Sequence, residues 1–267
     1  MDIGKPILSL EDVTLRRGDD VLLDGVSWTV REGQHWAVLG ANGSGKTCML
    51  RIATGYLWAS EGKVTCLGHP AGSHELRDLR MRIGWASSAL DPMIRTGNSA
   101  QEIILSGAFA ATGLFETPTD LNAIKCEKLM ELLHLTEVQD RRWHLLSLGE
   151  QRKTLLARSL MLDPELLILD EPCVGLDIPS REIFLDTLLH IHEPGFTKSA
   201  KSLVYVTHHV EELLSIFTHV VILKHGKILT AGPIADTLTS DVLTEAYDIP
   251  VEIEREHGRF WTRVKPH

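Results

Sequence analysis

Apolar and polar positions along the chain fall into two periodic patterns that alternate. Short continuous apolar runs predict buried strands, and the clearest are HWAVLG, PELLILDEP and SLVYVTHH, at residues 35–40, 164–172 and 202–209. Between such runs, stretches such as CMLRIATGYL (48–57) place apolar residues at the spacing of a helix. Strands that alternate with helices predict an α/β fold built on a mainly parallel sheet.

Other segments depart from this alternation. Residues 6–35 predict strands around the turn residues 18–20, and residues 99–146 are dominated by helical spacing, as in a helical insertion. Further short strands are expected at 62–68 and 82–88, and hairpins at 220–233 and 251–264. The last hairpin has no purpose that the pattern reveals.

Composition narrows the functional classes. The 267 residues suffice for one large domain or two small ones, and 43% hydrophobic with 24% charged residues is ordinary for a globular protein. A net charge of −9 argues against a protein that coats nucleic acid, so we expect no nucleic-acid partner, and the arginines of residues 75–85 are explained as a solvated face.

Cysteine usage and hydropathy indicate the compartment. The four cysteines are scattered without a C-x-x-C pair, which indicates neither zinc nor a disulfide framework and favours a reducing compartment. The first ten residues lack the apolar core of a signal peptide, and no run approaches the ~18–20 apolar residues of a membrane span. We therefore expect a cytoplasmic protein that reaches a membrane only through another subunit.

Candidate chemistry begins at GANGSGKTC, residues 40–48, which fits the phosphate-binding pattern G-x-x-x-x-G-K-[ST]. Inward-pointing main-chain N–H groups bind polyphosphates, and glycines let the backbone approach them. The helix that follows directs its positive end at the phosphates, Lys46 reaches the β- and γ-phosphates, and the Thr47 hydroxyl holds Mg²⁺. The predicted nucleotide-binding residues here are Gly40, Asn42, Gly43, Ser44, Gly45, Lys46, Thr47 and Cys48.

Two carboxylates follow the apolar strand in LLILDEP, residues 166–172. Asp170 emerges at the carboxyl end of the strand, where a carboxylate binds Mg²⁺ directly or through water, as in a Walker B strand. Glu171 follows and points differently, so it is placed to polarise an attacking water. The alternative is an ordinary acidic strand end before a turn.

The stretch LLSLGEQRK (145–153) has two interpretations. Ser147 is a natural helix N-cap with Glu150 three residues later, so an ordinary capping box explains it by itself. In its position before the Asp170 strand, however, it resembles the LSGGQ signature of ATP-binding cassette (ABC) ATPases. CVGLD (173–177) resembles the D-loop of that family, with Asp177 as its aspartate, and VTHHVEE (206–212) resembles its switch-histidine segment, with His208 as the histidine.

The resemblance extends from the first strands to about Pro233 and implies a three-part fold. It implies a P-loop NTPase (RecA-like) parallel-sheet core, an antiparallel β subdomain and an inserted helical subdomain that carries the signature. The whole chain, 1–267, is then a single nucleotide-binding domain. Its expected parts are the core with the β subdomain at 1–88 and 155–235, the helical subdomain at 89–154, and a C-terminal extension at 236–267.

The resemblance also implies that one chain does not complete the site. In the family, two cassettes pack head to tail, and the P-loop of one faces the signature of the other across ATP. Ser147, Gly149, Glu150 and Asp177 are then nucleotide contacts, the cofactors are ATP and Mg²⁺, and His208 contacts the γ-phosphate. The implied partners are a second ABC ATPase subunit, in the simplest case an identical copy, and a separate transmembrane permease that holds the protein at the inner face of the membrane.

Three departures from the family pattern stand out. Arg17 occupies the position of the aromatic residue that stacks on adenine; a guanidinium can also stack, or Trp28 or another group can substitute. Ser88 stands where many relatives have a glutamine that touches Mg²⁺. In the signature, Leu148 replaces a glycine and Glu150 replaces a glutamine. Together these features resemble a subgroup of stand-alone bacterial cassettes akin to molybdate-type import ATPases.

Two functions remain open at this point. The first is the energising ATPase of a transporter whose channel is a separate chain, which the set of Lys46, Asp170, Glu171 and His208 favours. The second is a soluble ATP-driven dimerisation switch with a non-transport partner, which Ser88 and the unexplained tail favour. A module that binds nucleotide and barely hydrolyses it is disfavoured by Glu171.

Overall fold

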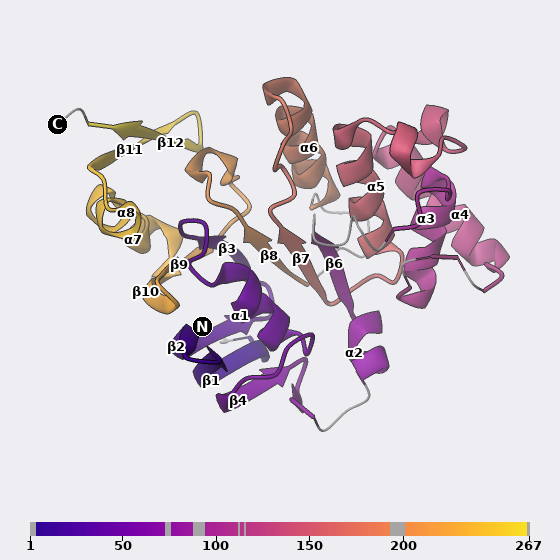
Figure 1. The fold of residues 1–267 in the computed structure, drawn as a ribbon. Coiled ribbons are helices and arrows are strands. Elements are labelled where there is room, and N and C mark those ends of the chain that lie inside the picture. Colours follow the sequence, from indigo (N-terminus) through magenta and orange to yellow (C-terminus); the bar gives the residue numbers. More distant parts are fainter. Residues whose placement is uncertain are drawn as a thin grey trace. The chain divides into compact units, whose positions relative to one another are not determined.

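The structure is a computed structural model that describes residues 4–72, 76–87, 94–111, 113–114, 116–192 and 201–265. The chain divides into two compact units (Figure 1). Unit 1 consists of Met1–Leu79 and Lys201–His267, and unit 2 consists of Arg80–Ala200. The subdomain boundaries expected from the sequence stay a prediction.

An antiparallel sheet opens unit 1. Its strands lie in the order β2-β1-β4-β5, and the two long strands β1 and β2 form where the sequence predicted strands around the turn at residues 18–20. Leu8, Leu10 and Val13 are buried on one side, and register shifts around Val13 mark bulges that twist the pair. The strands are β1 (Pro6–Arg17), β2 (Asp20–Arg31), β4 (Glu61–Cys66) and β5 (His69–Pro70).

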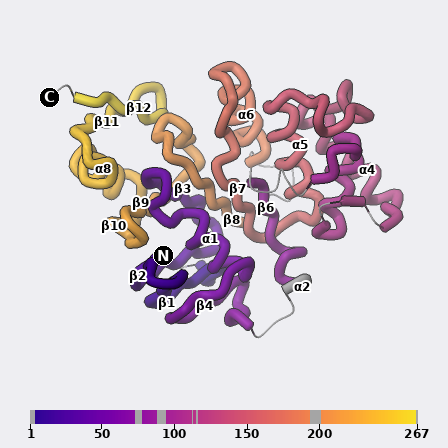
Figure 2. The backbone as a smooth tube through the Cα atoms, viewed as in Figure 1, coloured from indigo at the N-terminus to yellow at the C-terminus, as the bar shows by residue number. Residues whose placement is uncertain are grey.

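The parallel strands of unit 1 surround β3 (His35–Leu39). This strand pairs in parallel with β8 (Ser202–Val206) and with β9 (His219–Lys224), although about 170 residues separate them in the chain. Figures 1 and 2 show the indigo strand β3 beside the orange strand β9. All five residues of β8 are buried, as expected of a strand whose apolar run is continuous. The predicted α/β fold with its parallel strands is confirmed.

Two hairpins end the chain as predicted. β9 pairs with β10 (Lys227–Pro233) across His225-Gly226, and β11 (Val251–Glu256) pairs with β12 (Arg259–Val264) across His257-Gly258. Both turn residues have positive φ in each case, which is the backbone of a two-residue hairpin turn. Two helices connect the hairpins, α7 (Ile234–Thr237) and α8 (Ser240–Tyr247).

The helix after the glycine loop is shorter than its apolar spacing suggests. The pattern CMLRIATGYL continues to Leu57, but α1 (Lys46–Ala53) ends at Ala53. Gly55 has φ +74 and therefore cannot continue a right-handed helix. The expectation of helix beyond Ala53 was wrong, because Gly55 ends the helix although the apolar spacing continues to Leu57.

Unit 2 contains a pair of parallel strands and several helices. β6 (Ile83–Ser87) pairs in parallel with β7 (Leu166–Asp170), and all of β7 is buried. Helical spacing predicted α3 (Ala100–Ser106), α4 (Asp120–Leu132) and α5 (Leu148–Leu160). It did not predict α6 (Ile178–Ile191), nor α2 (Leu76–Met81), whose residues belong partly to each unit.

Candidate nucleotide-binding site

The glycine loop of unit 1 has a backbone that favours glycine at three positions, and two of these positions are also closely packed. Gly40, Gly43 and Gly45 have φ of +144, +80 and +104. A Cβ at Gly40 would overlap the carbonyl oxygen of Leu223, and one at Gly45 would lie 2.8 Å from Cδ2 of Leu23. The loop is therefore closely packed against Leu223 and Leu23, and its glycines allow a backbone whose amides can bind an anion.

Two polar groups inside the loop fit a polyphosphate. The Ser44 hydroxyl is buried and has no hydrogen-bond partner among the described residues, which is costly unless a ligand supplies one. Lys46 is only 5% exposed, and its Nζ donates to the carbonyls of Gly40 and Ala41 at 2.8 and 3.1 Å. An ammonium group and an unsatisfied hydroxyl thus lie where the loop amides and the start of α1 favour an anion.

The other residues of the loop that the sequence predicted as nucleotide contacts differ in exposure. Asn42 is exposed, while Thr47 and Cys48 are partly buried in the first turn of α1. Thr47 follows Lys46 directly, and its role as an oxygen ligand for Mg²⁺ stays a prediction.

The predicted metal carboxylate of unit 2 lies at the end of β7. Asp170 is 3% exposed, and its Oδ2 accepts a hydrogen bond from the Ser87 hydroxyl at 3.3 Å. Ser87 ends the neighbouring strand β6 and is also buried. The sequence prediction chose Ser88, which lies outside the described residues, and did not assign a role to Ser87; its only signal was its place at the end of the adjacent strand.

Glu171 directly follows Asp170 and has a φ of +50. Positive φ is uncommon outside glycine and changes the direction of the chain immediately after the strand. The backbone therefore turns between the two neighbouring carboxylates, and the separate roles assigned to them stay predictions.

The predicted signature residues form a complete capping box. The Ser147 hydroxyl accepts from the backbone N–H of Glu150 at 3.3 Å, and the Glu150 carboxylate accepts from the backbone N–H of Ser147 at 2.7 Å. The same carboxylate pairs with Nη1 of Arg141 at 3.1 Å. Glu150 therefore turns back onto its own helix, and Arg141 offsets its charge.

Leu148, the second departure in the signature, packs near the predicted D-loop. A Cβ added to Gly175 would lie 2.9 Å from Cδ2 of Leu148, and Gly175 has a φ of +80, which favours glycine. Gly149 adjoins Ser180, near the start of α6. Asp177 caps that helix by accepting from the N–H of Ser180 at 2.9 Å. Hydrogen bonds from the side chain and the backbone of Ser180 hold the pKa of Asp177 below its usual value.

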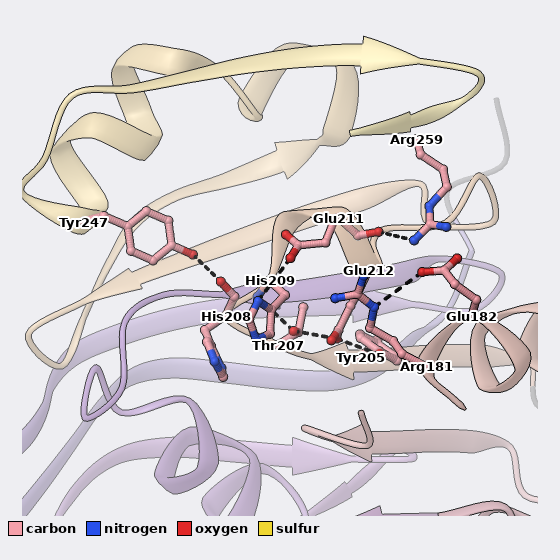
Figure 3. Close-up of polar contacts among 10 residues, drawn as sticks. All are labelled: Arg181, Glu182, Tyr205, Thr207, His208, His209, Glu211, Glu212, Tyr247 and Arg259. Carbon is pink, nitrogen blue, oxygen red and sulfur yellow. Dashed lines mark hydrogen bonds and ion pairs between the residues drawn. The ribbon is translucent and has the colours of Figure 1, made fainter. Parts of the chain in front are cut away.

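The predicted switch histidine follows β8 in unit 1. His208 is half-buried, and its ring lies 4.1 Å, between centroids, from that of His209. The segment is tied to the core through Glu212, whose buried carboxylate accepts from the hydroxyls of Tyr205 and Thr207 at 2.9 and 2.7 Å (Figure 3). The backbone beside the histidine is therefore held in place.

The two candidates for adenine stacking differ in exposure. Arg17 ends β1 with an exposed side chain, whereas Trp28 is 4% exposed and meets Trp36 edge to face at 5.6 Å. Trp28 is thus part of the core, and its ring faces are not available to a base. Of the two, only Arg17 remains a candidate.

Comparison with known proteins agrees with the fold and the motifs. The family model of the ABC transporter matches residues 23–174. The ABC transporter ATP-binding protein YlmA of Bacillus subtilis (strain 168) is 42% identical over 262 residues, covering 97% of this chain and 98% of that protein.

Solved structures show the same fold at lower identity. One is cbiO1 from Clostridium perfringens, part of the ABC transporter complex cbiONQ, with a TM-score of 0.74, 22% identity and coverage of 90% of this chain and 93% of that one. Another is the ATP-binding cassette MJ0796, a dimer in a post-hydrolysis state bound to ADP and phosphate, with a TM-score of 0.71, 22% identity and coverage of 85% and 98%.

The glycine loop, the buried strand with its carboxylates and the capped signature helix define a P-loop ATPase of the cassette class. The chain belongs to the ABC transporter family, among its ATP-binding proteins. Within the parts of the chain that the structure describes, no helix is long and apolar enough to cross a membrane.

Proposed function

We propose that this protein binds ATP with Mg²⁺ and hydrolyses it through the residues predicted from its motifs. The observation that carries the proposal is the glycine loop, which buries an unsatisfied Ser44 hydroxyl beside the Lys46 ammonium. Lys46 and the loop amides neutralise the phosphates, while Thr47 and Asp170 supply oxygen ligands to Mg²⁺. Glu171 orients the attacking water and His208 contacts the γ-phosphate. Together these residues supply the positioning and charge stabilisation that phosphoryl transfer mainly needs.

We further propose that two copies close head to tail around ATP. The start of α5 offers the partner's γ-phosphate a hydroxyl, main-chain N–H groups and the positive end of a helix of 13 residues. The charge of Glu150 is directed into its own cap and toward Arg141, which removes the main objection to a carboxylate in the signature. MJ0796, a neighbour in fold, is itself a dimer bound to ADP and phosphate, which supports dimer formation.

The proposed role of the dimer is to energise transport through a separate membrane subunit at the inner face of the membrane. Support comes from the ABC transporter family and from cbiO1, a fold neighbour that belongs to a multi-subunit complex. The relation to molybdate-type importers stays a prediction.

The second candidate is an ATP-driven dimerisation switch that acts on a non-transport partner. The C-terminal segment from α7 to β12 favours it, because none of the residues proposed above to bind or hydrolyse ATP lies in this segment. Purification in mild detergent separates the two functions. A permease retained by the chain supports transport, and a soluble partner captured only with ATP supports the switch.

The primary test is the mass in solution of Glu171→Gln, measured with and without ATP and Mg²⁺. We expect a monomer without nucleotide and a dimer with it, because the variant binds ATP but cannot activate water. Adding Lys46→Ala to the same chain should leave a monomer under both conditions. Hydrolysis by Glu171→Gln at the wild-type rate would show that the role given to Glu171 is wrong.

A further inference from the structure

The C-terminal segment of unit 1 lies against the residues that carry the predicted switch histidine. We call Thr207–Glu212 the switch segment. It includes a short 3-10 helix, Val210–Glu212, that β12 contacts directly. Figure 3 shows Tyr247, at the end of α8, and Arg259, at the start of β12, both directed at this segment.

Both side chains donate to main-chain carbonyls of the switch segment. The Tyr247 hydroxyl donates to the carbonyl of His208 at 3.2 Å, and Nη2 of Arg259 donates to the carbonyl of Glu211 at 2.5 Å. A bond to a carbonyl depends on the path of the backbone and not on the identity of the side chain. These two contacts therefore fix where the main chain runs on either side of His209.

The opposite side of the switch segment is held from the core. Glu212 accepts from Tyr205 and Thr207, and the Thr207 hydroxyl also accepts from the backbone N–H of His209 at 3.0 Å. His208 is thus the residue whose peptide is held between a core network and the C-terminal segment.

Tyr247 is itself well anchored. In α8, Leu243 is fully buried, and Nζ of Lys224 on β9 donates to the Glu245 carbonyl and pairs with Asp248 at 2.5 Å. Thr244 also exchanges hydrogen bonds with the main chain of Val251, at the start of β11. A donor on such a rigid support can restrain its acceptor, because the support does not yield.

The Tyr247 hydroxyl stays a donor throughout the physiological pH range. Burial, reinforced by the charge of Glu211, raises the pKa of Tyr247 to about 12. A carbonyl oxygen can only accept, so the direction of the bond to His208 is unambiguous.

We propose that Tyr247 and Arg259 are positioning residues for ATP hydrolysis, which act by holding the backbone of the switch segment so that His208 points at the γ-phosphate. The proposal rests on the proposed role of His208 and gives the C-terminal segment a function. Loss of either donor leaves the glycine loop intact, so nucleotide binding persists while the chemical step slows.

The test compares Tyr247→Phe with the wild-type chain in steady-state ATP hydrolysis. We expect kcat to fall about fivefold, as one neutral hydrogen bond implies, with the KM for ATP within about twofold. Tyr56→Phe, which removes a hydroxyl from an exposed tyrosine of the same unit, should leave both constants unchanged. A kcat within about 1.5-fold of wild type for Tyr247→Phe would overturn the proposal.

Arg259 provides an independent comparison. Arg259→Met keeps the length of the side chain without a donor, and Arg259→Lys keeps a donor. We expect kcat to fall for the methionine variant and to recover most of its value for the lysine variant, whereas Arg255→Met, in the same hairpin, changes nothing. Equal kcat values for the Met and Lys variants would contradict a positioning role and leave only a structural one.

The His208→Ala background distinguishes failure of this proposal from failure of the proposed function. Hydrolysis at the wild-type rate in His208→Ala would show that the assigned role of His208 is wrong. If His208→Ala is impaired, Tyr247→Phe should have no further effect in that background, because it acts through His208. An additional fivefold loss there would sink the positioning proposal while leaving the role of His208 standing.

Discussion

At the scale of single residues, the nucleotide loop depends on glycines for two separate reasons. Gly43 needs a positive φ but has open space around its Cα, whereas Gly40 needs a positive φ and also lies against the carbonyl of Leu223. The second requirement comes from β9, whose residues are far away in sequence. Identical letters in the motif thus carry different physical constraints.

The first prediction concerns Gly40→Ala. We expect this variant to lower the free energy of unfolding by about 2–4 kcal/mol, because backbone strain adds to the overlap with Leu223. It should also weaken nucleotide binding at least about tenfold, since the loop amides must move. Chemical unfolding and nucleotide titration measure the two effects.

Gly33→Ala is the matched control for this prediction. Gly33 has a φ of +84 and nothing within 4 Å of an added Cβ, so the variant carries strain without overlap. It should cost about 1–2 kcal/mol and leave nucleotide affinity unchanged. Equal losses for the two variants would mean that packing on Leu223 is unimportant.

At the scale of elements, α5 begins with a capping box that also orients the predicted signature. Glu150 serves the Ser147 N–H and the Arg141 guanidinium at once, and both bonds lie at the helix end that would face a partner's nucleotide. A carboxylate at this position therefore stabilises the start of α5.

The second prediction compares Glu150→Ala with Glu150→Gln. The alanine variant loses the cap and the ion pair, so we expect about 1–2 kcal/mol less stability. The glutamine variant keeps an oxygen for the Ser147 N–H and should lose less than half as much. Urea unfolding measures the free energy of unfolding of both variants. Glu131→Ala, which changes an exposed residue of α4, is the control and should leave that free energy unchanged. A glutamine variant as unstable as the alanine one would refute the capping role.

At the scale of the whole molecule, nucleotide binding and folding are linked. A ligand that binds only the folded chain stabilises it in proportion to the logarithm of its concentration over its Kd. Binding in the loop between β3 and α1 should therefore raise the thermal stability of the entire chain.

The third prediction is a thermal shift that depends on Lys46. At a concentration about 100-fold above its Kd, a non-hydrolysable ATP analogue with Mg²⁺ adds about 2.7 kcal/mol, which corresponds to a Tm increase of about 5–10 °C. Lys46→Ala should abolish the shift, and Lys63→Ala, on an exposed strand position, should retain it. A shift that survives in Lys46→Ala would place the nucleotide elsewhere.

The sequence by itself determined the features that depend on local periodicity and local geometry. Continuous apolar runs predicted β3, β7 and β8, helical spacing predicted α3 to α5, and adjacent histidine and glycine residues predicted the two terminal hairpins. Ser147 and Glu150 are three residues apart, so their mutual capping was also predictable. These features need only neighbours along the chain.

Only the tertiary structure decided the contacts that join distant segments. The Ser87 hydroxyl meets Asp170 across 83 residues, Trp28 turns into the core against Trp36, and Tyr247 reaches the carbonyl of His208 across 39 residues. No periodicity encodes such pairs, because they depend on which strands become neighbours and on where each chain segment ends. The packing of the folded chain chose Ser87 as the partner of Asp170 and gave the terminal hairpin a place beside the switch segment.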